Sequence, residues 1–278
     1  MNDKFIILRN DIVWDVERNK NTMVNINELY LEIIIYLQRK TDLDELCGFT
    51  IENMVSKCGY KPNNNKGKIN SKFKECLGLM QNNGYLNCDI SLFSIKDKTY
   101  IECELSDKMK FKLDNEGNKT EYFKVNLESI KKIYSDSSTL KKSTLLKTYC
   151  YICSRIKKRT VAMNEQIKDT SSYQDTIVEE THFNSIDIED DLNMNKDTFL
   201  KAIDRLKEIG LIYYGNIGYV KLNNLKHIAN NVYALNKEDY LRAIQCSKQY
   251  YKDKGYELLG NKNKIKINNS KNGKMAHN

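Results

Sequence analysis

The residues best placed to do chemistry in this sequence are lysines that gather around the start of a predicted helix. Residues 65–74 read Asn-Lys-Gly-Lys-Ile-Asn-Ser-Lys-Phe-Lys and contain no acidic side chain. Helical periodicity over 68–83 turns Ile69, Phe73 and Met80 inward and leaves polar side chains on the outward face. In a DNA-reading helix the first residues contact bases, and flanking lysines contact phosphates. The candidate DNA contacts here are Lys66, Lys68, Asn70, Ser71, Lys72 and Lys74.

Genome composition offers another reading of this cluster. Asn, Lys, Ile and Tyr are abundant throughout the chain, which is typical of an AT-rich genome, and proline occurs once. The lysines can therefore also be an ordinary solvated helix face.

Two further places carry basic side chains in a suitable position. The polar loop between predicted strands 85–88 and 99–103 adds Lys96 and Lys98. A predicted helix over 196–209 mixes basic residues with acidic ones, which repel phosphates unless they accept from cytosine. Its candidate contacts are Lys196, Thr198, Lys201 and Arg205, followed by Asn216 in the next turn. Dimerisation or binding of a partner protein is the alternative for this helix.

Signatures of catalysis and of metal binding are missing from the sequence. It has no phosphate-binding, dinucleotide-binding, zinc-protease or nucleophile-elbow motif, and its three histidines are isolated. Cys150 and Cys153 have the CxxC spacing of zinc and redox sites, but they fall in an apolar helical run and no second pair follows. We therefore interpret them as helix core. We expect no enzymatic activity, cofactor, metal or small-molecule substrate.

Charge and hydropathy narrow the choice of partner and compartment. The net charge of +8 favours an anionic partner without identifying it. The longest apolar run, around Ile33 to Leu37, is far short of the roughly 20 residues of a membrane span. The N-terminus lacks the cleavage site of a signal peptide. We expect a cytoplasmic protein without membrane contact, whose eight cysteines stay reduced.

The elements that would position the lysines occur twice in the same order. The first set comprises helices at 25–37, 50–57 and 68–83 and strands at 85–88 and 99–103. The second comprises helices at 139–156, 185–191 and 196–209 and a hairpin, 211–214 with 217–222, that turns at Gly215-Asn216. In both sets a glycine, Gly84 or Gly210, ends the long helix just before a strand. This order is that of a winged helix, so we expect a mostly α, α+β protein with two winged-helix domains in tandem.

The expected organisation follows from these elements. It places an N-terminal winged-helix domain at 1–107, a linker with the strand that leads into the second domain at 108–138, a second winged-helix domain at 139–235, a C-terminal helix at 236–260 and a basic disordered tail at 261–278. The polar stretch 161–181 is expected to be a long loop.

This tandem layout resembles plasmid and phage replication initiators of low-GC Gram-positive bacteria. The resemblance rests on three runs: Phe-Lys-Val-Asn-Leu at 123–127, Leu-Leu-Lys-Thr-Tyr-Cys-Tyr-Ile at 145–152, and the helix and strand start at 195–212. It implies double-stranded DNA as partner, with binding to repeated origin sites, opening of an AT-rich segment and recruitment of host replication proteins.

Two other functions stay open. One is a transcriptional or partition regulator, a homodimer on a palindromic site. The other is a protein-interaction scaffold of a replication or conjugation complex.

Overall fold

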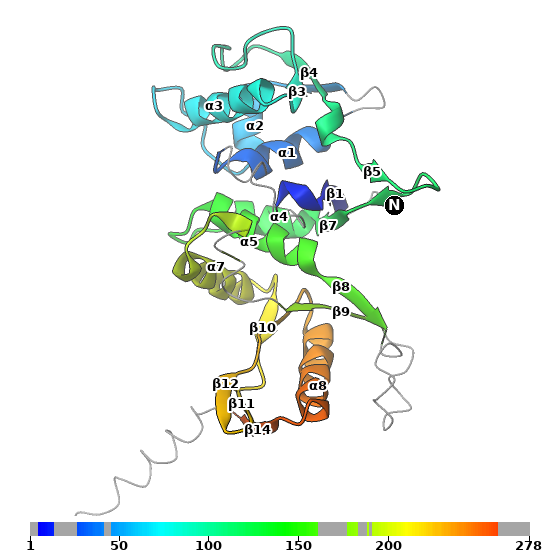
Figure 1. Cartoon of the computed structure of the whole chain (residues 1–278). Helices are drawn as coiled ribbons and strands as arrows, with labels where there is room; N and C mark the ends of the chain where they lie inside the picture. Colours follow the sequence, from blue (N-terminus) through cyan, green and yellow to red (C-terminus); the bar gives the residue numbers. More distant parts are fainter. Residues whose placement is uncertain are drawn as a thin grey trace, which may run out of the picture. The chain divides into compact units, whose positions relative to one another are not determined.

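The computed structural model describes residues 5–13, 27–41, 46–160, 177–182, 188 and 191–260. These residues form a mixed α/β structure in which small antiparallel sheets accompany the helices (Figure 1). The chain divides into two compact units. The first comprises Met1–Ser154 with Ser185–Ile209, and the second Arg155–Asn184 with Gly210–Asn278. No helix in the described ranges has the length and apolar character needed to cross a membrane.

Residues 30–105 of the first unit alternate helices with the strands of one sheet. In chain order the elements are α1 (Tyr30–Gln38), β2 (Leu46–Phe49), α2 (Ile51–Lys57), α3 (Ile69–Asn82), β3 (Leu86–Asn87) and β4 (Ile101–Leu105). β4 lies between β2 and β3 and is antiparallel to both. All residues of α1 from Tyr30 to Leu37 are buried, which explains why every one of them except Glu32 is apolar or aromatic. α3 contributes Phe73, Leu77 and Met80 to the core, as its periodicity predicts.

Three helix ends in the structure have a local cause in the sequence. The Thr50 hydroxyl caps α2 by accepting a hydrogen bond from Asn53 N at 3.2 Å. Gly84 ends α3 with φ +69°, and Gly210 follows α7 (Lys196–Glu208) with φ +70°. Both glycines adopt the left-handed conformation that a side chain disfavours. The repeated glycine signal is thus confirmed at both helices.

A strand near the start of the chain forms a two-stranded sheet in the first unit. β1 (Phe5–Arg9) pairs antiparallel with β7 (Tyr122–Asn126). A 3₁₀ turn over Asn10–Ile12 follows β1.

The stretch 108–138 is more regular than the linker we expected. It contains a 3₁₀ turn over Asp107–Met109, the short hairpin of β5 (Lys112–Leu113) and β6 (Lys119–Thr120), β7, and α4 (Leu127–Tyr134). Asn126 caps α4 by accepting from Glu128 N at 2.8 Å.

α5 (Lys142–Arg155) and α7 are the remaining helices of the first unit that are described in full. Cys150 and Cys153 are buried in α5, which confirms their interpretation as helix core. Of the short helix expected at 185–191, Ile188 and Asp191 are helical, and 185–187 and 189–190 lie outside the described residues.

The second unit holds the strands that follow α5 and α7. Its elements are β8 (Lys157–Thr160), β9 (Ile177–His182), β10 (Tyr213–Gly215), β11 (Tyr219–Leu222), β12 (Leu225–Ile228), β13 (Val232–Ala234), α8 (Lys237–Asp253) and β14 (Glu257–Gly260). They form two antiparallel sheets with strand orders β10-β13-β9-β8 and β12-β11-β14. Asn236 caps α8 by accepting from Asp239 N at 2.8 Å. The expected loop 161–181 ends in β9 from Ile177, while 161–176 and the tail 261–278 lie outside the described residues.

The hairpin expected at 211–222 is wrong. β10 pairs with β13, not with β11, and the tight turn lies at Asn223-Asn224, between β11 and β12. These two asparagines have φ +47° and +65°, the conformation of a type I′ hairpin turn. Gly215-Asn216 is not the predicted hairpin turn, because Gly215 is itself part of β10, opposite Val232.

Candidate nucleic-acid interface

The chain approaches α3 through an exposed polar turn. Lys66 and Lys68 are exposed, and Lys68 is the last residue before the helix. The first turn of α3 has no acidic residue, and the Ser71 hydroxyl donates back to Lys68 O at 2.8 Å. Free N–H groups and the helix dipole favour anions at such an end. Exposed lysines and a helix N-terminus therefore coincide here.

Lys72 lies one turn further along α3 and is half exposed. Its Nζ is 3.8 Å from Glu28 Oε1, and the same carboxylate accepts from Lys141 at 2.6 Å. Exposed pairs of this kind contribute about 1 kcal/mol or less. The Lys72 ammonium is thus available to exchange Glu28 for another anion.

Asn70 has a role that the sequence did not predict. Its side chain is buried, with 2% exposure, although we expected it to face DNA. Its Oδ1 accepts from Asn63 N at 2.8 Å, and its Nδ2 donates to Asp97 Oδ2 at 2.7 Å. The amide therefore joins the turn before α3 to the loop between β3 and β4.

Asp97 is the second anchor of that loop. The Lys74 ammonium lies 2.9 Å from Asp97 Oδ1, and its side chain is only 21% exposed. Burial alone would raise the pKa of Asp97, but the hydrogen bond from Asn70 and the charge of Lys74 outweigh it and hold the pKa below its usual range. Lys96 and Lys98 flank Asp97 in sequence and are both exposed. The structure thereby brings the lysines of the loop to the first turns of α3.

Further contacts hold the loop 88–100 along α3. Gln81 Nε2 donates to the carbonyls of Cys88, at 3.1 Å, and Ile90, at 2.9 Å, and its Oε1 accepts from Leu92 N at 3.1 Å. Gly78 leaves room for the Phe93 ring, because a Cβ there would lie 2.5 Å from it. The sequence contained no recognisable signal for these contacts.

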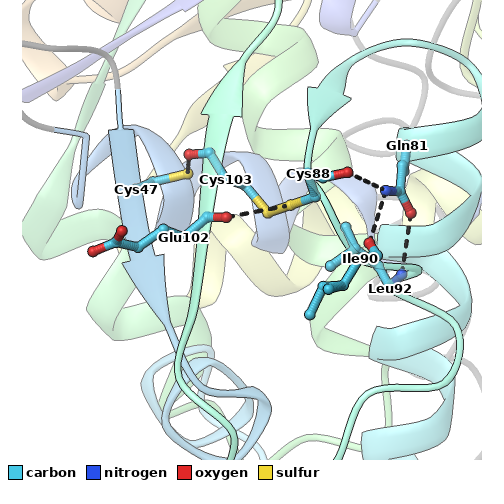
Figure 2. Close-up of a disulfide and its surroundings, with 7 residues drawn as sticks. All are labelled: Cys47, Gln81, Cys88, Ile90, Leu92, Glu102 and Cys103. Atoms are coloured by element: carbon cyan, nitrogen blue, oxygen red, sulfur yellow. Dashed lines mark hydrogen bonds between the residues drawn. A yellow bond between two sulfur atoms is a disulfide. The ribbon is translucent and has the colours of Figure 1, made fainter.

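A disulfide closes the base of the same loop. Cys88 and Cys103 are joined with their Cα atoms 4.9 Å apart (Figure 2). The expectation that all eight cysteines stay reduced is therefore corrected. The physical reason is strand pairing: Asn87 lies opposite Glu104, so the next residue, Cys88, meets Cys103.

The second predicted DNA-reading helix, α7, has a different character. Lys196 and Lys201 are exposed and Thr198 is half-buried. Arg205 is committed to Asp136, with its Nη2 2.5 Å and its Nε 2.9 Å from Oδ1, and also contacts Glu208 at 2.8 Å. Its position therefore suits a structural ion pair better than a phosphate contact.

Asn216 belongs to the second unit and shapes a turn there. Its Oδ1 accepts from Gly218 N at 2.9 Å, and its Nδ2 donates to Asn231 Oδ1 at 2.7 Å. Both ends of the side-chain amide thus have partners within the unit.

No family model matches the chain, and no curated protein sequence matches it. Within the described ranges, no group of three or more His, Cys, Asp or Glu residues could hold a metal ion. What the structure brings together is a basic surface, Lys66, Lys68, Lys72, Lys96 and Lys98, on the start of α3 and the adjoining loop.

Proposed function

We propose that the chain binds double-stranded DNA, and that residues 27–105 act as a winged helix. The observation that carries the proposal is the order helix, strand, helix, helix, strand, strand with β4 between β2 and β3. In a winged helix the third helix enters the major groove and the loop between the last two strands follows the backbone. These two elements are α3 and the loop 88–100, which carry the basic surface.

The contacts of Asp97 support these separate roles of α3 and the loop 88–100. Asp97 neutralises Lys74 and fixes the loop, while Lys96 and Lys98 on either side remain exposed. Phosphate contacts position a protein on DNA, and side chains at the start of the helix read bases. We assign Lys66, Lys96 and Lys98 to phosphates and Lys68, Ser71 and Lys72 to the groove.

A second winged helix is part of the proposal. In the second unit β13 lies between β9 and β10, the same strand order as β2-β4-β3. The helix that precedes β10 in the chain ends at Gly210 as α3 ends at Gly84. α7 would offer Lys196, Thr198 and Lys201, but its exposed carboxylates and the commitment of Arg205 make it the weaker reader.

For the biological process we propose replication initiation, with the resemblance to plasmid and phage initiators as support. A protein of this kind binds an array of repeats. A regulator would bind a single palindrome, and a scaffold would not bind duplex DNA in a salt-dependent manner.

Fluorescence anisotropy on duplexes from the DNA around the gene, with a scrambled duplex as control, tests the proposal. Lys68→Glu combined with Lys72→Glu is expected to weaken binding to the specific duplex about tenfold or more, because a good base contact is worth about 1–3 kcal/mol. Lys248→Glu with Lys252→Glu is the matched control, since these exposed α8 residues have the same spacing and charge. Equal loss in both variants would refute the assignment of α3. Lack of salt-dependent duplex binding by the unmodified protein would refute DNA binding and favour the scaffold.

A further inference from the structure

Three cysteines lie in a row across the sheet of the first unit. Cys47 in β2 is opposite Cys103 in β4, and Cys88 directly follows β3 on the other side of β4 (Figure 2). Cys103 is bonded to Cys88, while the Cys47 thiol donates to the carbonyl of Cys103 at 3.0 Å. The three cysteines are therefore cross-strand neighbours in this sheet.

The disulfide lies where the loop 88–100 leaves and rejoins the sheet. β3 is two residues long, so its pairing with β4 holds the base of the loop over a short distance. The bond between Cys88 and Cys103 closes a ring that contains Lys96 and Lys98. A covalent link at this place restricts how far the loop can separate from β4.

The two cysteines of the bond differ in exposure. Cys103 is 1% exposed, whereas Cys88 is half-buried at the point where the chain leaves β3. A thiol from solvent therefore reaches the sulfur of Cys88 more easily than that of Cys103. Thiol–disulfide exchange depends on which sulfur can be reached, so attack is expected at Cys88.

We propose that Cys88 and Cys103 form a reversible redox site that controls the order of the loop 88–100. A dithiol attacks Cys88 Sγ as the thiolate, the S–S bond breaks, and Cys103 Sγ leaves with the electron pair and takes up a proton. The second thiol of the reagent then attacks the mixed disulfide, which releases Cys88 as a thiol and leaves the reagent as a cyclic disulfide. In the reverse direction hydrogen peroxide oxidises the Cys88 thiol to a sulfenic acid with release of water. The Cys103 thiolate then attacks that sulfur and displaces hydroxide, which takes up a proton to give a second water.

The consequence for DNA rests on the proposed function. In the oxidised form Lys96 and Lys98 are held beside α3 before DNA arrives. In the reduced form the base of the loop must be ordered on binding. The redox state of Cys88 and Cys103 then controls the affinity for duplex DNA. The order of the loop 88–100 reports that redox state directly.

Hydrogen–deuterium exchange of the full chain tests the inference, with dithiothreitol and hydrogen peroxide as the two reagents. Reduction is expected to increase exchange in the loop severalfold, and peroxide treatment after removal of dithiothreitol is expected to reverse it. Cys88→Ser should show the exchange of the reduced form under both treatments. Cys246→Ser, at a half-buried cysteine of α8, is the matched control and should respond like the unmodified protein. Unchanged exchange in the loop on complete reduction, verified by thiol titration, would overturn the inference.

Duplex affinity, measured on the same samples, separates the two proposals. We expect reduction to weaken binding about tenfold, because the loop and two lysine side chains must then be ordered on binding. A redox-dependent loop in a protein that binds no DNA would refute the proposed function and support the redox site. Equal affinity in both forms would leave DNA binding standing and overturn the control of affinity.

Discussion

The carboxyl group of Glu32 makes the stability of this protein depend on pH in an unusual direction. Glu32 lies in α1 and is fully buried. Its Oε1 accepts from the Tyr60 hydroxyl at 3.1 Å, and its Oε2 has no hydrogen-bond partner among the described residues. Burial raises the pKa of Glu32 from 4.5 to about 7, although the hydrogen bond from Tyr60 opposes the rise.

The sign of the effect follows from the protons bound in each state. Between pH 4.5 and 7 the folded protein keeps the proton on Glu32 while the unfolded chain loses it. Unfolding therefore becomes easier as the pH rises through this window. The full rise in pKa corresponds to about 3 kcal/mol, of which about 2 kcal/mol falls between pH 5 and 7.5. Lys147, whose pKa burial lowers to about 8, stays largely charged in this interval.

Glu32→Gln tests this reasoning because the amide imitates the protonated acid. Urea unfolding of both proteins, monitored by circular dichroism at about pH 5 and 7.5, gives the free energy of unfolding at each pH. The change between the two pH values is then compared between the variant and the unmodified protein. We expect the variant to lose about 2 kcal/mol less than the unmodified protein between the two pH values. Ionisable groups that do not interact with Glu32 cancel in this comparison.

Two further variants serve as a control and as a second test of the pKa of Glu32. Glu75→Gln, at an exposed position of α3, should keep the pH dependence of the unmodified protein. Tyr60→Phe removes the hydrogen bond that lowers the pKa, so the loss of stability should extend to higher pH. The same pH dependence in Glu32→Gln as in the unmodified protein would show that Glu32 is not a buried acid.

Three more substitutions probe the loop and the helix ends, each by urea unfolding. Asn70→Ala should cost about 2 kcal/mol, because Asn63 N and Asp97 lose a buried partner, whereas a residue that only reads bases would leave stability unchanged. Gly78→Ala should cost about 1–3 kcal/mol through overlap with the Phe93 ring, and a gain in stability, as helix propensity alone predicts, would contradict that packing. Gly210→Ala meets no atom within 4 Å but must adopt φ +70°, so a loss of about 1 kcal/mol is expected, and no loss would argue against the left-handed helix end.

Local features of this protein could be read from the sequence because local physics determines them. The periodicity of α3, the caps at Thr50 and Asn236 and the glycines that end α3 and α7 depend on residues within a few positions of one another. Hydrophobic spacing and side-chain caps act over one or two turns. The positions of these helices therefore followed from the sequence alone.

Strand partners and side-chain partners were decided by tertiary structure. β10 pairs with β13 rather than the nearer β11, because pairing depends on which edges meet in the folded sheet. Asn70 was predicted to face DNA, and its burial became visible only when Asp97 was placed 27 residues further along the chain. In the same way Cys88 and Cys103 were two of eight dispersed cysteines until the pairing of β3 with β4 joined them. Sequence spacing carries the local periods of helices and strands, whereas contacts between distant residues depend on how the elements meet in the fold.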